Sequence, residues 1–388
     1  MSCGAYHRGV ERFDVLVVGA GPAGSAAAIH LARGGARVLL ADKARFPRDK
    51  PCGGGLTGRA LRHVPCEVSP IVEHVVDRFV VRVGYRGRFA RRSAAPLILM
   101  TQRRRLDAFL AEHAAAVGAD FRDDARVERL LLAADHVTAL VGGSSVRASL
   151  VVGADGANGI VARTAALGEG IVTGIALEGN APWGALDPTP FERTAWVELG
   201  VVPGGYGWVF PKGDHGNVGV GAWLDEGPRL RHHLERLARV HGLDPTALRN
   251  VRGHRLPMRR IGAPAARGRA LLVGDAAGLV DPLSGDGIYE AFVSARLAAD
   301  AILTGELDEY EAALSAALDR HASASWAAKR AADRYPRACY WAARAPGVFD
   351  TVAGLLRGDL AHPSEARVVA RPPLRALSRL ARLARPIP

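Results

Sequence analysis

The chain has 388 residues, of which 48% are hydrophobic and 23% are charged. This composition is typical of a globular protein with a large core and excludes disordered, fibrous and disulfide-stapled classes. The net charge of +12 comes mostly from arginine, because lysine occurs only at positions 43, 50, 212 and 329. Two interpretations stay open: a coding bias toward arginine, and a surface or pocket that attracts anions such as phosphates or acidic lipids.

Charge and cysteine patterns exclude several partners and compartments. Scattered arginines without a recognition helix or an aromatic-interleaved basic motif argue against nucleic acid. The first dozen residues lack the apolar stretch of a secretion signal, and no apolar run reaches the roughly 18 residues of a membrane span. We therefore expect a cytoplasmic protein. No metal site is expected, because neither a CxxC pair nor a zinc-type spacing occurs among Cys3, Cys52, Cys66 and Cys339.

A strand, turn, helix and strand are predicted at the start of the chain. An apolar, β-branched run over residues 13–18 leads into a glycine-rich turn, a helical stretch over 25–33 and a second apolar run over 36–41. This change of periodicity predicts one βαβ unit.

The turn carries Gly19, Gly21 and Gly24 in the spacing GxGxxG. Gly19 permits the tight turn, Gly21 lets a pyrophosphate approach the backbone, and Gly24 lets the helix pack against the strand. Asp42 lies 18 residues after Gly24 at the end of the second strand, where a carboxylate accepts hydrogen bonds from ribose hydroxyls. The pattern predicts an adenine dinucleotide site, and the acidic residue favours FAD or NAD.

Further elements are predicted along the rest of the chain. From about residue 170 to 260, Trp, Pro and Gly cluster and strand patterns dominate, which predicts a sheet-rich domain inserted into the first. We also predict a hairpin of residues 75–83 and 85–89, a helix over 106–117, a hairpin of 127–132 and 137–141, strands over 149–153 and 270–273, and a helix over 287–303 followed by helical sequence.

A segment over residues 271–291 carries Gly-Asp at 274–275 and Gly-Asp-Gly at 285–287. It resembles the flavoprotein family that includes p-hydroxybenzoate hydroxylase, the flavin-dependent halogenases and the geranylgeranyl reductases. The resemblance implies that Asp275 bonds the ribityl chain of FAD and that Gly285 and Gly287 pass close to the flavin ring. A helix N-terminus at this place would stabilise negative charge on a reduced ring.

Two more family motifs are present, one of them in part. Residues 103–107 resemble the family's Arg-x-x-Phe-Asp, which implies that Arg103 lies beside the cofactor. Asp155 begins a stretch similar to the Asp-Gly motif, but Gly159 and Ala162 replace its usual Ser and Arg. In monooxygenases this motif also serves the nicotinamide donor, so that role stays open here.

Two long stretches narrow the resemblance. Residues 47–61 are similar to the Lys-x-Cys-Gly-x-Gly-Leu loop of geranylgeranyl and menaquinone-type polyprenyl reductases, and residues 205–212 match their Tyr-x-Trp-x-Phe-Pro-Lys. The resemblance implies that Cys52 lies near the flavin and that the aromatic residues wall the space in front of it. The alternatives are a small buried cysteine and a strand face that only packs in the core.

The resemblance implies three sets of site residues and no metal ligand. Catalytic residues are expected at Cys52, Lys50, Trp208 and Tyr206, and the substrate pocket is expected at Trp208, Phe210 and Pro211. Cofactor-binding residues are expected at Gly19, Gly21, Ala23, Gly24, Asp42, Lys43, Cys52, Gly53, Arg103, Asp155, Gly274, Asp275, Gly285, Gly287 and Ile288.

We predict an α/β fold: a doubly wound FAD-binding domain with an inserted mixed β-sheet substrate domain and a helical C-terminal region. The FAD-binding domain is expected from residues 13–66, 100–168 and 264–305, the substrate domain from 67–99 and 169–263, and the helical region from 306–388. Because no second GxGxxG unit follows, NADPH, NADH or another external donor is expected to dock only transiently.

The implied activity is reduction of C=C double bonds in an isoprenoid or polyprenyl lipid, with hydride from the flavin and a proton from an acid or water near Cys52. The alternative is a flavin-dependent monooxygenase, a hydroxylase or epoxidase, or a halogenase acting on a specialised metabolite. A halogenase would need a lysine between flavin and substrate, for which Lys50 and Lys212 are candidates. A flavin-binding carrier without turnover is a third hypothesis.

The last residues predict an amphipathic helix. Leucines recur at positions 374, 377, 380 and 383 with arginines between them. Residues 373–388 have two interpretations: packing over the pocket of the same protein, or contact with an anionic membrane. The second would place a cytoplasmic protein at the inner face of the membrane.

Overall fold

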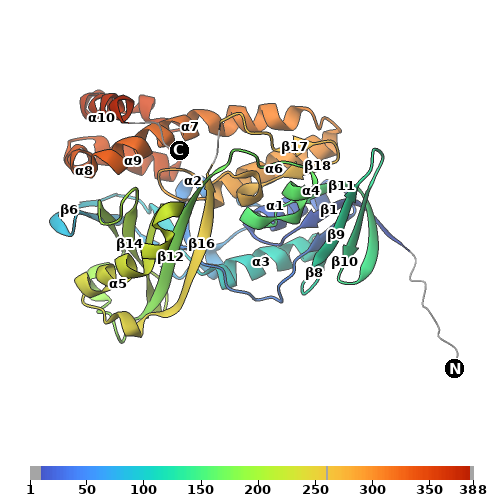
Figure 1. Cartoon of the computed structure of the whole chain (residues 1–388), viewed down its shortest axis with the longest axis horizontal. Coiled ribbons are helices and arrows are strands. Elements are labelled where there is room, and N and C mark those ends of the chain that lie inside the picture. The colour runs from blue at the N-terminus through green and yellow to red at the C-terminus, as the bar shows by residue number, and fades with distance from the viewer. Residues whose placement is uncertain (1–9, 259–260, 385–388) are drawn as a thin grey trace.

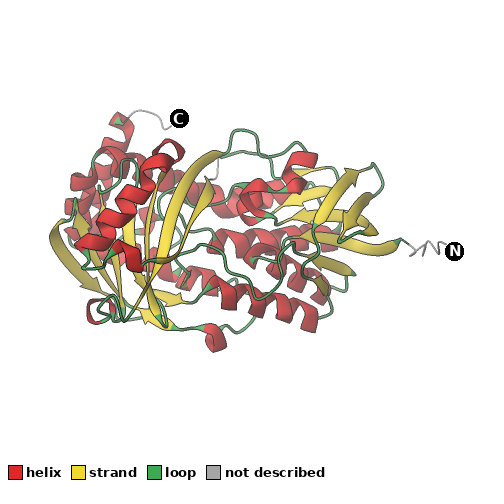
Figure 2. Cartoon of the chain, turned by 60° about the horizontal axis from the view of Figure 1, so that its bottom comes forward, coloured by secondary structure: helices red, strands yellow, loops and turns green. Residues whose placement is uncertain are grey.

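Two large β-sheets lie along the long axis of the molecule, and helices pack around both (Figure 1; Figure 2). The computed structural model describes residues 10–258 and 261–384. The predicted fold class is confirmed, whereas the predicted domain boundaries stay a prediction. Among the described residues, no helix has both the length and the hydropathy that crossing a bilayer requires.

The first sheet has eight strands in the order β17-β18-β11-β1-β2-β8, with β10 and β9 extending it beside β11. Its strands are β1 (Glu11–Val18), β2 (Val38–Ala41), β8 (Asp120–Arg122), β9 (Val127–Leu132), β10 (Val137–Val141), β11 (Ser144–Gly153), β17 (Ala266–Arg267) and β18 (Ala270–Leu272). The hairpin predicted for 127–132 and 137–141 is confirmed. The strand predicted over 149–153 begins earlier, at Ser144.

The register of the parallel strands places four carboxyl ends at one edge. Val18 lies opposite both Ala41 and Gly153, and Gly153 lies opposite Leu272. Helices α1 (Pro22–Arg33), α3 (Arg103–Ala116) and α6 (Ile288–Thr304) pack against one another beside this sheet. In an open parallel sheet, ligands bind at the carboxyl edge.

The second sheet has seven strands in the order β16-β12-β15-β14-β13-β5-β6. Its strands are β5 (Arg78–Val83), β6 (Arg86–Arg92), β12 (Val172–Pro182), β13 (Thr194–Leu199), β14 (Tyr206–Pro211), β15 (His215–Trp223) and β16 (Arg249–Met258). Helix α5 (Leu230–Val240) packs its leucines against Val209, Val218 and Val220 on one face. The opposite face is therefore left for the cavity described below.

The third sheet is small and corrects one prediction. It consists of β3 (Gly55–Thr57), β7 (Ile98–Met100) and β4 (His74–Val76). The hairpin predicted for 75–83 and 85–89 holds only for β5 and β6, because Val76 pairs with Ile98 in this sheet instead. Asp77 separates the two strands, and its carboxylate pairs with Arg92 and Arg193.

Helices make up the last part of the chain. They are α7 (Glu309–Arg334), α8 (Pro336–Arg344), α9 (Val348–Arg357) and α10 (Arg371–Leu383), and the short helices α2 (Gly58–Leu61) and α4 (Ile160–Thr164) lie earlier. Figure 1 shows α7 running from the α6 side of the molecule toward α8, α9 and α10, and α8 contacts β5 and β13. The C-terminal region thus touches both large sheets.

Candidate active site

A cavity of about 1350 Å³ joins the carboxyl edge of the first sheet to the open face of the second. Its walls come from segments as far apart in sequence as Val18 and Leu377. Most of the predicted cofactor residues line it: Gly19, Gly21, Ala23, Asp42, Lys43, Cys52, Gly53, Arg103, Asp155, Asp275, Gly285, Gly287 and Ile288. Gly24 and Gly274 instead lie where elements pack closely.

The turn after β1 needs its glycines for steric reasons. Gly19 has φ of +99°, and a Cβ there would lie 2.5 Å from the carbonyl oxygen of Ala154. A Cβ on Gly24 would lie 1.8 Å from the carbonyl oxygen of Gly19. These contacts bring α1 against the turn, so that the N-terminus of α1 opens toward the cavity.

Asp42 is fixed at the end of β2 by two backbone donors. Its carboxylate accepts hydrogen bonds from the N–H of Ala20 at 2.8 Å and from the N–H of Ala44 at 2.9 Å. The first bond ties Asp42 to the glycine turn. The carboxylate is thereby held where a ribose would lie if the phosphates sat on the turn.

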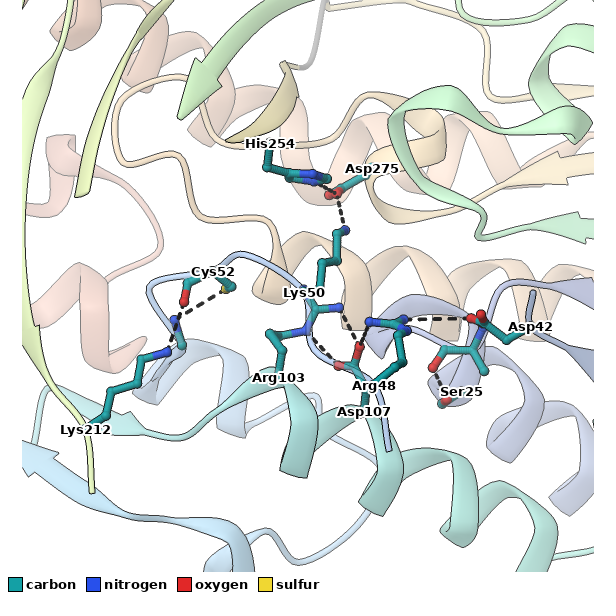
Figure 3. Close-up of polar contacts among 12 residues, drawn as sticks. Ser25, Asp42, Arg48, Lys50, Cys52, Arg103, Asp107, Lys212, His254 and Asp275 are labelled. Atoms are coloured by element: carbon teal, nitrogen blue, oxygen red, sulfur yellow. Dashed lines mark hydrogen bonds and ion pairs between the residues drawn. The ribbon is translucent and has the colours of Figure 1, made fainter. Parts of the chain in front are cut away.

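Two guanidinium groups lie beside the glycine turn. An added Cβ on Gly21 would lie 3.6 Å from Nη2 of both Arg48 and Arg103. Asp107 holds both arginines: it accepts from Arg103 at 2.7 and 2.8 Å and pairs with Arg48. Figure 3 shows Arg48 between Asp107 and Asp42. Sequence reasoning missed Arg48, because no motif carries it.

Asp275 also lines the cavity, and its carboxylate lies close to a lysine and a histidine. Lys50 Nζ lies 3.1 Å from its carboxylate and His254 Nε2 lies 3.5 Å away (Figure 3). Burial raises the pKa of Asp275, but Lys50 and His254 outweigh it and hold the pKa below its usual range. Lys50 therefore offsets the charge of Asp275, and its predicted catalytic role stays a prediction.

The Gly285–Gly287 turn lies next to Asp275. A Cβ on Gly287 would lie 3.1 Å from the Asp275 carboxylate, and Gly285 has φ of +68°. Helix α6 starts directly after this turn, at Ile288. The two halves of the 271–291 segment thus meet at the cavity, as the resemblance implies.

Asp155 lines the cavity, but its carboxylate accepts hydrogen bonds from the backbone of α4. Its Oδ2 accepts from the N–H groups of Ile160 at 2.6 Å and Val161 at 3.2 Å. A Cβ on Gly159 would lie 2.2 Å from Oδ1 of Asp155. This contact gives a steric reason for glycine at a position where the family motif has serine.

The aromatic residues of β14 line the cavity from the second sheet. Every second residue of this strand, Tyr206, Trp208 and Phe210, faces the cavity. The ring of Phe210 would lie 3.2 Å from a Cβ added to Gly53. The Tyr206 hydroxyl donates to the carbonyl of Ser284, beside the glycine turn before α6. Pro211 falls on the other face because side chains alternate along a strand.

The part of the cavity that lies between the second sheet and the C-terminal helices is lined mainly by apolar residues. Val81 and Leu199 face it from the second sheet, and Phe349, Leu374 and Leu377 face it from α9 and α10. One buried charge pair lines this part. Lys329 Nζ donates to the carbonyl of Gly204 at 2.6 Å and pairs with Asp333, whose carboxylate also accepts from Trp223 at 2.9 Å.

This arrangement fits a bound FAD at the carboxyl edge. The glycine turn has the close approaches that a phosphate cradle needs, Asp42 is fixed at the ribose position, and two guanidinium groups face the turn. Among the described residues, no group of three or more His, Cys, Asp or Glu side chains is placed to hold a metal ion.

Comparisons with known proteins agree with this fit. A family model described as an FAD binding domain matches residues 12–189. The geranylgeranyl diphosphate reductase of Rhodobacter capsulatus is 32% identical over 75% of this chain and 75% of that protein. The menaquinone reductase of Mycobacterium tuberculosis is 33% identical over 76% of this chain and 77% of its own length.

Solved structures share the fold over nearly the whole chain. A geranylgeranyl bacteriochlorophyll reductase-like protein from Thermoplasma acidophilum has a TM-score of 0.75 at 23% identity and covers 95% of this chain and 96% of its own. A flavin-dependent brominase has a TM-score of 0.74 at 20% identity and covers 96% of this chain and all of its own. Identities this low show the fold and leave the reaction open.

Proposed function

We propose, since the chain belongs to the geranylgeranyl reductase family of FAD-dependent oxidoreductases, that it reduces C=C double bonds of an isoprenoid or polyprenyl lipid. One observation carries the proposal: the cofactor edge and a long apolar chamber are parts of a single cavity of about 1350 Å³. An extended hydrocarbon chain fits such a chamber, which removes apolar surface from water. The names of the two reductase relatives support the same substrate class.

The residues of this chain would position the two reactants and exclude water. FAD, when bound, supplies the hydride and takes its electrons from an external donor such as NADPH or NADH. Trp208 and Phe210 would hold an alkene against the edge of the first sheet. The helices α9 and α10 would shield the remaining hydrocarbon from water.

Cys52 is the proposed proton donor. Its side chain lines the cavity next to Gly53 and Phe210, and Arg103 lies near enough for the two groups to interact electrostatically. In this step the S–H bond breaks, a C–H bond forms at the alkene carbon, and a thiolate remains beside the Arg103 guanidinium. Solvent returns the proton after the product leaves.

The lysines argue against a halogenase. That reaction would need a lysine free to meet the substrate, and Lys50 and Lys212 were the candidates. Lys50 is paired with Asp275 at 3.1 Å, and Lys212 is 4% exposed and donates to the carbonyl of Cys52 at 3.0 Å. A flavin-dependent hydroxylase is the remaining oxygen-using alternative, which the test below separates.

The test is anaerobic turnover of FAD-loaded protein that has been reduced chemically. With geranylgeraniol, geranylgeranyl diphosphate or menaquinone, we expect flavin reoxidation without oxygen and a product that has gained two hydrogen atoms per reduced bond. Cys52→Ala should slow product formation about 10²- to 10⁴-fold, as loss of a general acid does. Reoxidation that requires oxygen, with one oxygen atom added to the product, would contradict the proposal.

The C-terminal region is the proposed contact with an anionic membrane, where such lipids reside. Val368, Val369 and Leu383 are 73%, 55% and 75% exposed. Exposed arginines on α10 lie beside this apolar surface, and leucines of the same helix line the cavity. A basic, amphipathic helix binds the headgroup region of anionic bilayers.

Charge reversal tests this contact. Replacing Arg375, Arg379 and Arg382 by Glu should lower co-sedimentation with phosphatidylglycerol vesicles while FAD stays bound. The matched control reverses three exposed arginines elsewhere, at positions 104, 129 and 231, and should bind vesicles almost as the parent does. Equal losses in both variants would point to net charge alone and remove the proposed contact.

A further inference from the structure

The peptide groups of Cys52 are held from both sides by buried ionisable residues. The N–H of Cys52 donates to Glu178 Oε1 at 2.6 Å, and its carbonyl accepts from Lys212 Nζ at 3.0 Å. Figure 3 shows Lys212 reaching the Cys52 backbone from the side opposite Arg103. Glu178 is 8% exposed and Lys212 is 4% exposed. A shift of the Cys52 backbone would therefore break the hydrogen bond to Glu178 or the one from Lys212.

The loop is shaped for this approach. Gly54 has φ of +74°, and a Cβ there would lie 2.5 Å from Lys212 Nζ and 2.1 Å from the carbonyl of Thr101. Any side chain at this position would push the ammonium group away. The N–H of Gly54 also donates to the Cys52 sulfur at 3.3 Å, which orients the thiol within the loop.

A chain of polar side chains continues from Glu178 to the aromatic wall. Asn217 lies near enough to Glu178 to lower the pKa of that carboxyl, and its side-chain oxygen accepts from the indole N–H of Trp208 at 2.8 Å. Glu178 lies on β12 and Asn217 on β15, which pair directly. The Cys52 loop and the Trp208 strand lie more than 150 residues apart in sequence, yet two side chains connect them.

Burial makes this network sensitive to charge. Burial raises the pKa of Glu178, while Lys212, the Cys52 N–H and Asn217 oppose that rise. A buried charge persists only when it is paired and hydrogen-bonded. Lys212 therefore favours the ionised form of Glu178 beneath the Cys52 loop, against the effect of burial.

A second, water-sized pocket of about 20 Å³ lies behind the loop. A cavity this small has room for about one water molecule, and polar walls favour its binding. Ionisable and amide groups from several elements line it: Asp49, Lys50, Gln102, Arg103, Glu178, Asn180, Lys212, His215, Asn250 and Arg252.

We propose that Glu178, Lys212 and Asn217 are positioning residues that set the orientation and reactivity of the Cys52 thiol and connect it to Trp208. The proposal rests on the proposed function only in giving Cys52 the role of proton donor. The thiol itself can be followed in the absence of any substrate. The two charges should act on it in opposite directions, since a nearby cation stabilises a thiolate and a nearby anion destabilises it.

The experiment measures the rate at which iodoacetamide alkylates Cys52 as a function of pH, with FAD bound and with mass spectrometry of the Cys52 peptide. Lys212→Met should slow alkylation near neutral pH about three- to tenfold and move its pH profile upward. Glu178→Gln, which keeps an acceptor for the Cys52 N–H, should speed alkylation by a similar factor and move the profile downward.

Three further variants separate position from charge. Lys212→Arg should restore most of the parent profile. Asn217→Ala should change the rate while the midpoint moves less, because it removes the link to Trp208 and no charge. Arg252→Met is the matched control, since this cation lines the same small pocket but its side chain is 49% exposed and solvent screens it. It should change the rate less than about twofold.

The outcomes distinguish this proposal from the proposed function. Opposite shifts for Lys212→Met and Glu178→Gln support the positioning role even if no alkene is reduced. Shifts in the same direction, or no shift in protein that retains FAD, would overturn it whatever reaction the enzyme performs. If Lys212→Met fails to fold, Glu178→Gln and Lys212→Arg decide the matter.

Discussion

A buried arginine, Arg103, and a largely buried one, Arg59, line the same cavity, and their surroundings differ. Arg103 makes a two-point ion pair with Asp107, with N–O distances of 2.7 and 2.8 Å. Arg59 lies 3.7 Å from Asp286 and 3.6 Å from Glu290, which is too far for hydrogen bonds. Its one close polar contact is Nη1 to His321 Nε2 at 2.8 Å.

The polar atoms around Arg59 are also less satisfied than those around Arg103. Among the residues that the structure describes, Arg59 Nε and one carboxylate oxygen each of Asp281, Asp286 and Glu290 are buried without a hydrogen-bond partner. His321 Nε2 also lies 3.5 Å from the Asp281 carboxylate. The Arg59 guanidinium thus faces three carboxyl groups, those of Asp281, Asp286 and Glu290.

The two arginines also differ in how they affect the pKa values of the groups around them. Burial would lower the pKa of Arg103, but Asp107 outweighs it and raises that pKa. Around Arg59, burial raises the pKa of Glu290 well above its usual range, and Arg59 opposes this only in part. Arg103 and Asp107 thus form a fixed framework beside the glycine turn, whereas burial favours the protonated form of Glu290 behind the Gly285–Gly287 turn.

Asp107→Ala should show the largest effect, because it leaves Arg103 buried without its partner. Breaking such a pair from one side costs about 3–5 kcal/mol, and FAD retention should fall with it. The matched change, Glu290→Ala, removes a neutral group and should cost less. Urea unfolding with flavin fluorescence measures both. Equal losses would mean that Glu290 is ionised and paired, contrary to the comparison.

Replacing each of the two arginines by lysine tests the same comparison from the side of the cation. Arg103→Lys loses two-point geometry and should cost about 2 kcal/mol. Arg59→Lys keeps the charge near Asp286 and Glu290 and loses one hydrogen bond to His321, so it should cost about 1 kcal/mol. The same unfolding curves report both values. A reversed order would indicate that Arg59 makes shorter contacts than those described.

Glu290→Gln should show the smallest effect and the clearest dependence on pH. A carboxyl whose pKa is raised by folding contributes stability at low pH and loses it as pH rises above the usual value of 4.5. The Gln variant has no such loss. Its melting temperature relative to the parent should therefore rise between about pH 5 and about pH 8. A constant difference across this range would show that Glu290 does not hold the proton.

Much of the dinucleotide half was predictable because its signals are local. Gly24 is required by its contact with the carbonyl of Gly19 in the same turn, Gly19 is required there by its φ of +99°, and Asp42 follows the strand that presents it. The helix predicted over 106–117 begins earlier, at Arg103, and has no side-chain cap. Hydrophobic periodicity could not predict that first turn, because residues 103–105 are all arginine. The turn is stabilised by the ion pair between Arg103 and Asp107, four residues apart.

The rest of the site could not be predicted, because its partners come from distant strands and helices. Glu178 and Asn217 meet Cys52 and Trp208 only after the second sheet has formed, and no spacing rule connects them. Lys50 was predicted from its motif to be catalytic, but its pairing with Asp275 depends on a residue 225 positions away. The roles predicted for Cys52, Tyr206 and Trp208 stay predictions until turnover is measured.

The strand order of the first sheet has a consequence during synthesis of the protein. Strand β18 lies beside β11 in the sheet, but five of the seven strands of the second sheet, β12 to β16, are encoded between them. At about 5–20 residues per second, a ribosome makes β18 roughly 13–50 s after β1. Until then the nascent chain carries an open β11 edge, which can pair wrongly with other strands. Completion of the FAD-binding sheet, and with it cofactor capture, therefore belongs to the last part of translation.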